Sequence, residues 1–275
     1  MKPRTYLRDL AFILSLLLII IALSYATAMG GLGPLPPIDL RPLAIAYLRT
    51  TYNPENRLFT AMSPEGVTAI VWDYRGIDTF FETVVFYGAI IGALTLYREV
   101  CKARDILPIR GLSIVVKRTT AVMALAIIVV AFATALHGHL TPGGGFQAGA
   151  IAAVAPLVML VAFSKVFIER KGMNYTRLLV MRNLGLVGVG LTAVLLVVMG
   201  LIAGLNAFIF QNQRKILSEL SFPSWILDVP AGGSLLFFNI FEMIAVVAGF
   251  TLVFTILSSS EELARVEVQG EEHGF

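Results

Sequence analysis

The sequence predicts an all-α integral membrane protein with about six transmembrane helices. Hydrophobic residues make up 57% of the 275 residues and charged residues only 14%, whereas soluble domains carry roughly 25% charged residues. The mean hydropathy is +0.82. Several apolar segments also have the roughly 17 to 25 residues that cross a bilayer. We place these spans at about 10–28, 78–97, 119–136, 146–168, 183–205 and 233–257.

The first span follows a basic start and resembles a secretory signal. Lys2, Arg4 and Arg8 precede the apolar run, and Ala26-Thr27-Ala28 has the small residues of a cleavage site. The run is longer than the apolar core of such a signal, so we expect a signal anchor that stays in the membrane.

An extended, proline-rich linker is predicted at 30–42, followed by a surface element at 43–62. Ser63-Pro64-Glu65 then has the pattern of a helix start, with Ser63 as the capping residue, Pro64 at the first position and an acid in the first turn.

Basic residues in the connections predict the orientation. They gather at the N-terminus and in the connections after the second and fourth spans. We assign Arg182 to the connection after the fourth span. Both termini are therefore expected in the cytoplasm of a plasma-membrane protein, and residues 137–145 outside. The single cysteine, Cys101, lies in a basic connection and is expected to be an inert thiol. Residues 258–275 form an acidic cytoplasmic tail, and no basic patch with interleaved aromatic residues predicts a nucleic-acid partner.

Charged residues gather at the start of the second span, in VWDYRGIDTFFE at 71–82. Charges within a span usually face protein or water and mark ion pathways. In one helix, Arg75, Asp78 and Glu82 would share a face, and two acids spaced by four residues suit a proton or transient sodium site. Alternatively, Thr79 and Glu82 form a capping box that begins the helix there. The residues leave open whether the helix begins at this point or runs through from Pro64 with a bend near Gly76.

Glu242 lies near the middle of the last span, with Asn239 three residues earlier on the same face. A glutamate at this depth is either part of an ion relay or a neutral group that bridges helices.

The stretch HGHLTPGGGFQAG at 137–149 separates two spans. His137 and His139 titrate near neutral pH, as a proton relay requires, but they diverge in a helix and no third metal ligand is near. Pro142 is expected to end the third span. Three glycines in a row allow the backbone to approach a partner closely. A tight loop with interfacial histidines is the structural alternative.

The same stretch resembles the signature of the B subunit of Mrp-type multisubunit sodium/proton antiporters, which is Gly-His-x-x-Pro-Gly-Gly-Gly-Phe followed by small residues. The resemblance covers about 115–257, which holds four spans, as in that family. The last span departs from the antiporter pattern because FNIFE stands at 238–242 where Phe-Asp-x-Gly is expected. The matching loop residues are His139, Pro142, Gly143, Gly144, Gly145 and Phe146.

Residues 66–98 separately resemble the C-terminal end of the large Mrp A subunit. The matching residues are the Arg-Gly pair at Arg75 and Gly76 and the acids Asp78 and Glu82. In archaeal membrane-bound hydrogenases and sulfane reductases the two segments occur as neighbouring subunits. The resemblance therefore implies a fusion, with a two-span segment at 1–110 and a four-span segment at 111–257.

The resemblance implies an accessory subunit of an ion-translocating complex, without a redox cofactor of its own. Its expected partners are large antiporter-like subunits, small subunits of the C, E, F and G types, and a peripheral hydrogenase-like arm. The implied ion path involves Glu82, Asp78, Arg75, Glu242 and His139. The alternative is a purely structural subunit that carries no ions. An independent transporter and an intramembrane enzyme are disfavoured because the sequence has neither a clear internal repeat nor a catalytic constellation.

Overall fold

The computed structural model describes residues 3–31, 39–97 and 111–258. The chain forms two units, Met1–Ile45 and Ala46–Phe275, which are described separately. In the described part, six helices are long and apolar enough to cross a membrane, which confirms the predicted fold class. The predictions for Cys101 and for the acidic tail lie outside the described residues.

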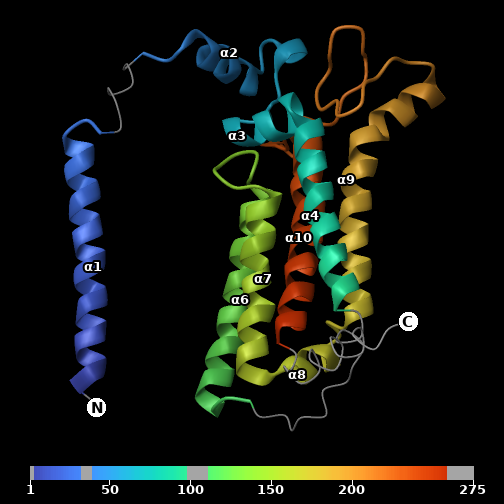
Figure 1. The fold of residues 1–275 in the computed structure, drawn as a ribbon. Coiled ribbons are helices and arrows are strands. Elements are labelled where there is room, and N and C mark those ends of the chain that lie inside the picture. Colours follow the sequence, from blue (N-terminus) through green and yellow to red (C-terminus); the bar gives the residue numbers. More distant parts are fainter. Residues whose placement is uncertain (1–2, 32–38, 98–110, 259–275) are drawn as a thin grey trace, which may run out of the picture. The chain divides into compact units, whose positions relative to one another are not determined.

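The first unit is dominated by the long helix α1 (Pro3–Ala28) (Figure 1). Its side chains from Asp9 onward are all exposed. Two of its hydroxyl groups bond within the helix, because Ser15 and Thr27 each donate to the carbonyl four residues earlier. A helix with an apolar surface on every side suits a lipid environment. Most of the linker predicted at 30–42 lies outside the described residues. The helix α2 (Pro42–Thr51) begins at Pro42.

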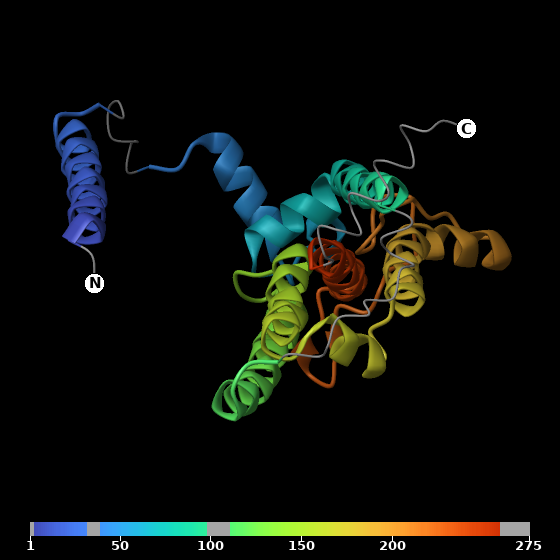
Figure 2. The same cartoon turned by 60° about the horizontal axis from the view of Figure 1, so that its bottom comes forward.

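The second unit is a helical bundle built around α10 (Ser234–Leu257). This helix packs against α7 (Gly145–Phe163) and α9 (Tyr175–Ala203), and also touches α4 (Gly76–Leu96) and α6 (Ile114–Leu136). Figure 2 shows α10 enclosed by its neighbours. Small residues allow this close packing, since a Cβ at Gly188 would overlap the ring of Phe241.

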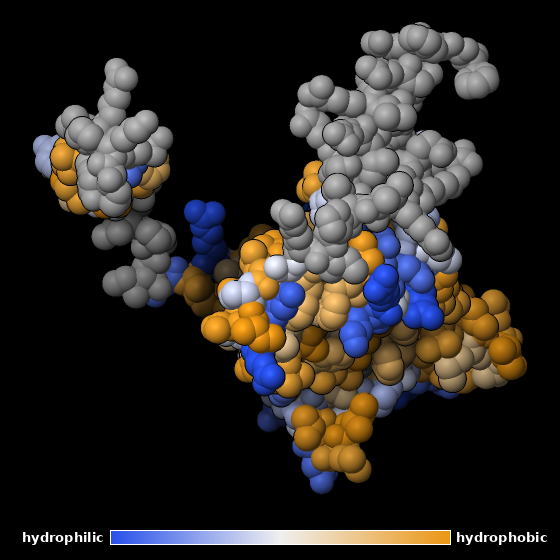
Figure 3. All heavy atoms as spheres, turned by 90° about the horizontal axis from the view of Figure 1, so that it is seen from below, coloured by the Kyte–Doolittle hydropathy of each residue, from blue (hydrophilic) through white to orange (hydrophobic). Residues whose placement is uncertain are grey.

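The short helix α8 (Lys165–Arg170) lies at one end of the bundle. Figure 3 views the molecule from this end and shows hydrophilic residues with hydrophobic residues on either side of them. The other end carries the connections 137–144 and 204–233, and we call it the loop end. Its hairpin pairs β1 (Trp225–Ile226) with β2 (Val229–Pro230), and the two residues between them have positive φ, as tight hairpin turns require.

Helix α9 begins eight residues before the predicted span. Asn174 caps it by accepting from the backbone N–H of Arg177 at 2.9 Å, and Gly204 ends it in the left-handed conformation. Arg182 was therefore wrongly placed in a basic connection: it lies within α9 and is only 1% exposed.

The segment before α4 is helical but broken. It contains a turn of 3₁₀ helix, Arg57–Phe59, then α3 (Gly66–Thr68) and a π-helix, η2 (Ala69–Tyr74), which ends at a bend at Arg75. The predicted start at Ser63 is wrong, because Glu65 caps α3 by accepting from the N–H of Thr68 at 2.5 Å. Each of the two alternatives for the second span is thus partly correct. Helical structure does precede Gly76, in α3 and η2, but α4 is a separate helix that begins at Gly76.

Candidate functional site

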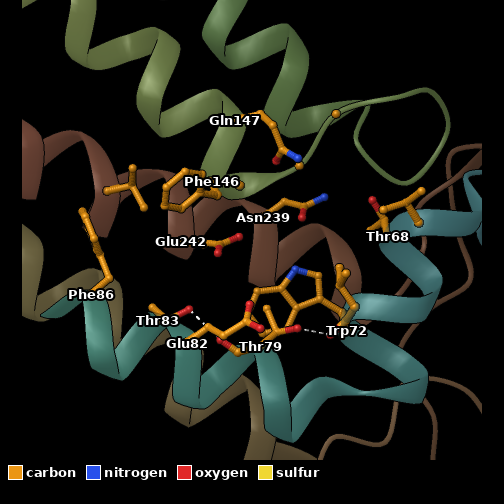
Figure 4. A pocket seen from close by; sticks show the side chains of 16 residues that line it. Thr68, Trp72, Thr79, Glu82, Thr83, Phe86, Phe146, Gln147, Asn239 and Glu242 are labelled. Carbon is orange, nitrogen blue, oxygen red and sulfur yellow. Dashed lines mark hydrogen bonds between the residues drawn. The ribbon is translucent and has the colours of Figure 1, made fainter. Parts of the chain in front are cut away.

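A cavity of about 320 Å³ lies at the loop end, between η2, α4, α7 and α10. All three regions that the sequence singled out contribute to it: the start of the second span, the surroundings of Glu242 and the glycine run. Figure 4 shows Glu82 and Glu242 on different helices, on opposite sides of the same space. The polar lining is completed by three threonines, an amide pair and the glycine run: Thr68, Thr79, Thr83, Gln147, Asn239, Gly143, Gly144 and Gly145.

Glu242 is buried, with 7% of its surface exposed, eight residues into α10. The first turn of α7 lies directly against its carboxylate. A Cβ at Gly145 would be 2.6 Å from Oε2 of Glu242. The N-terminal end of a helix carries a partial positive charge and free N–H groups, so this position favours a carboxylate. The glycine run thus allows the close approach that the sequence predicted, and the approach is to a helix of the same chain.

Glu82 borders the cavity from the second turn of α4, and its side chain is also exposed on the surface of the bundle. The cavity is therefore open beside Glu82. Glu82 and Glu242 thus border the same cavity from α4 and α10. The capping box that the sequence suggested for Thr79 and Glu82 does not form. The Thr79 hydroxyl instead donates to the carbonyl of Val71 at 2.5 Å, and the N–H of Thr79 donates to the carbonyl of Arg75 at 3.3 Å.

Arg75 and Asp78 lie apart from this cavity. They form an exposed ion pair of 2.7 Å with each other, and they line a second hollow that Glu82 does not line. The second hollow also contains Asp73, whose buried carboxylate pairs with Lys215 at 3.3 Å. Burial raises the pKa of Asp73 above its ordinary value, and the neighbouring Lys215 partly opposes this shift. The structure therefore brings Glu82 together with Glu242 and not with Asp78.

His139 is buried beside the cavity without lining it. Its Nε2 donates to the carbonyl of Pro230 at 2.7 Å, while its Nδ1 has no hydrogen-bond partner. Burial lowers the pKa of His139 below 6.5, the bond to Pro230 opposes this, and His137 adds a smaller lowering. This places a neutral imidazole in a structural position.

The backbone around His139 joins the two segments of the chain. The carbonyl of His139 accepts from the Ser63 hydroxyl at 2.7 Å and from the N–H of Glu65, and the carbonyl of Gly138 accepts from the Thr68 hydroxyl at 2.6 Å. We call these three bonds the loop latch. Pro142 does not end α6, because that helix already ends at Leu136. The latch instead fixes the loop that leads into α7.

Asn239 was recognised in the sequence only as a neighbour of Glu242. The structure buries it completely at the cavity, and neither of its amide atoms has a hydrogen-bond partner. Thr79, Glu82, Thr83 and Phe86 all line the cavity and are spaced as one helical face, which is the signal that could have identified the threonines. Among the described residues, no group of three or more His, Cys, Asp or Glu side chains could hold a metal ion.

Residues 115–252 match the family model described as a domain related to the MnhB subunit of the Na⁺/H⁺ antiporter. The chain belongs to this family. The matched segment contains α7 and the part of α10 that carries Asn239 and Glu242, whereas Glu82 lies before it. The cavity is thus built partly by the MnhB-related domain and partly by the segment that precedes it.

Three comparisons extend beyond this domain. The MnhB-related chain is 27% identical over 228 residues to the uncharacterized protein MJ1307 of Methanocaldococcus jannaschii, covering 76% of this chain and 82% of that protein. Its fold is similar to a chain of the membrane-bound sulfane sulfur reductase, an archaeal respiratory membrane complex, with a TM-score of 0.57, 23% identity and coverage of 92% and 100% of the two chains. It is also similar to a chain of the Mrp complex from Dietzia sp. DQ12-45-1b, with a TM-score of 0.58 and 16% identity, covering 95% of this chain and 26% of that one. The protein is therefore a multi-pass membrane protein whose fold occurs in both complexes.

Proposed function

We propose that this chain is an accessory membrane subunit of a multisubunit Mrp-type Na⁺/H⁺ antiporter module within a respiratory, hydrogenase-like complex of the plasma membrane. In this proposal the cavity between Glu82 and Glu242 forms part of the ion path. The observation that carries it is that two carboxylates from separate segments of the chain line one cavity within the membrane-spanning part of the bundle.

The chemistry of this arrangement suits a small cation. Two negative charges that border one cavity repel each other, and a proton or Na⁺ between them would relieve the repulsion. Threonine hydroxyls and the amide oxygen of Asn239 supply further oxygen ligands of the kind that hard cations prefer. Exchange of Na⁺ for H⁺ at such a site needs no redox cofactor in this subunit.

The partner interface is proposed at α4. Glu82 is exposed in a membrane-spanning helix, and charged groups in such helices nearly always face protein or water. A neighbouring antiporter-like subunit that covers this side of α4 would shield Glu82 from lipid and would pass ions to or from it. The fusion of an A-like segment at 1–110 with a B-like segment at 111–257 is part of this proposal, and it is supported by the cavity and the loop latch, which both join residues from the two segments.

A purely structural subunit is the second candidate, and the loop latch favours it. Its three bonds tie the segment before α4 to the loop before α7 through hydroxyl, N–H and carbonyl groups, none of which carries a charge. In that case Glu82 and Glu242 would serve only to hold helices together.

Na⁺/H⁺ exchange by the complete complex in proteoliposomes distinguishes the two candidates. Glu82→Gln and Glu242→Gln keep the side-chain volume and remove the charge, and Glu55→Gln is the matched control because Glu55 is exposed and lies outside the cavity. The ion-path proposal predicts that each cavity variant loses exchange by roughly tenfold or more, with assembly intact and the control unchanged. An assembled Glu82→Gln complex that exchanges ions at the wild-type rate would leave only the structural role.

A further inference from the structure

Arg182 is a buried cation that the proposed ion path does not use. It is 1% exposed within α9, and its guanidinium lies over the ring of Tyr87 of α4, 4.1 Å from the ring centre. Its Nη2 donates a long bond of 3.4 Å to Oδ1 of Asn183, which also accepts from the Tyr87 hydroxyl at 3.0 Å. Tyr87 and Asn183 thus hold the guanidinium from two helices.

The positive charge of Arg182 is not neutralised by a carboxylate of the described residues. Its Nε and Nη1 have no hydrogen-bond partner, and the ion pairs seen in this part of the chain join other residues, Arg75 to Asp78 and Lys215 to Asp73. A guanidinium keeps its charge at every physiological pH. A buried cation that has no counter-charge among the described residues is costly, and helix packing alone would be served better by an apolar side chain.

The position of Arg182 relative to the cavity follows from the helices around it. Tyr87 lies five residues after Glu82, which is about 7.5 Å further along α4 and away from the loop end. Phe86 is the last residue of α4 that lines the cavity, and neither Tyr87 nor Arg182 lines it.

Aromatic rings close the cavity on this side. Phe86 packs edge-on against Phe146 at 5.9 Å and against Phe250 at 5.2 Å, and Phe146 and Phe250 are 6.1 Å apart. Arg182 lies in α9 beyond the level of Glu82. A cation that moved from the cavity toward the α8 end would therefore meet an apolar barrier and then a fixed positive charge.

We propose that Arg182 is an electrostatic plug that prevents cations from crossing the bundle of this chain from end to end. Buried positive charges exclude cations from membrane pores in the same way. A cation in the cavity must then leave sideways, at the opening beside Glu82, and not along the axis of the bundle. This inference rests on the proposed function, because it assigns the direction in which ions leave the same cavity.

The test is the passive Na⁺ permeability of proteoliposomes that contain the complete complex, measured without a driving pH gradient. Arg182→Gln and Arg182→Met remove the charge while keeping most of the volume, and Arg182→Lys is the matched control that keeps it. We expect the neutral variants to leak Na⁺ faster by on the order of tenfold, while Arg182→Lys stays as tight as the wild type. Assembled neutral variants without a leak would overturn the proposal, and so would neutral variants that fail to assemble while Arg182→Lys assembles, because the charge would then be needed only for folding.

Adding Glu242→Gln to a leaking variant separates this inference from the proposed function. If the leak disappears, ions reach Arg182 through the cavity and both proposals stand. If the leak persists unchanged, Arg182 still blocks cations but the Glu82–Glu242 cavity is not their route, which contradicts the proposed function alone.

Discussion

Replacing Gly145 by alanine would insert a methyl group between the start of α7 and the carboxylate of Glu242. The added Cβ would be 2.6 Å from Oε2 of Glu242, 2.6 Å from the carbonyl oxygen of Asn239 and 2.7 Å from Cβ of Glu242. Ordinary contacts begin at 3.4 Å, so α7 and α10 must separate by about 0.8 Å or Glu242 must leave its position. Overpacking of this kind costs about 1–3 kcal/mol.

Two control variants separate the effect on the carboxylate from the effect on packing. At Gly149, one turn further along α7, a Cβ would be 2.6 Å from Cβ of Val246, and its three nearest atoms belong to Val246 and Met243 and not to a cavity carboxylate. At Gly190 of α9 nothing lies within 4 Å of the added Cβ, so alanine there is expected to be neutral or to stabilise the helix by roughly 0.5–1 kcal/mol.

The assays are the thermal stability of the purified complex and its Na⁺/H⁺ exchange in proteoliposomes. We expect Gly145→Ala and Gly149→Ala to lower stability by similar amounts, and only Gly145→Ala to reduce exchange beyond the loss of folded complex. If Gly145→Ala were as stable and as active as Gly190→Ala, the close contact between α7 and Glu242 would not matter and the reasoning would be refuted.

Two further predictions concern groups outside the spans. Burial lowers the pKa of His139, so below pH 6.5 the unfolded chain binds a proton at this residue more readily than the folded chain, and stability should fall as the pH decreases through 6.5. His139→Gln should remove this pH dependence from melting curves recorded between about pH 5 and 8. A pH dependence that is unchanged in the variant would contradict the prediction. Lys215→Met removes the ion-pair partner of the buried Asp73 and should cost about 2 kcal/mol at neutral pH. Because protonation removes the buried charge, this loss should shrink as the pH falls toward 3.8, the ordinary pKa of Asp73, and a loss that is the same at every pH would show that the pair is not responsible.

Length and composition were enough to predict the membrane-spanning helices, because a bilayer imposes a minimum apolar length on each of them. Length and composition placed the start of α9 too late in the chain. Arg177 and Arg182 lower the hydrophobicity of this segment, although both lie within the helix. An arginine held over the Tyr87 ring looks in sequence like any other loop arginine.

The cavity was only half predictable. Glu82 and Glu242 each stood out as charges within apolar segments, but 160 residues separate them and no local pattern shows that they share a cavity. The sequence instead grouped Glu82 with Asp78, which the spacing allows. In the structure Asp78 pairs with Arg75 and lines the second hollow, not the cavity. The loop latch was not predictable, because its acceptors are backbone carbonyls that carry no signature in the sequence.

The central claim, that a cation occupies the cavity between Glu82 and Glu242, is tested most directly by the accessibility of a cysteine at Thr83. Thr83 lines the cavity, and Thr83→Cys changes its size little. With Cys101, the only natural cysteine, replaced by serine, a small membrane-impermeant thiol reagent should label this position in the assembled complex. Na⁺ should slow the labelling in a concentration-dependent way, and Glu242→Gln should abolish that protection. Labelling that never occurs, or that proceeds at the same rate with and without Na⁺, would contradict the claim.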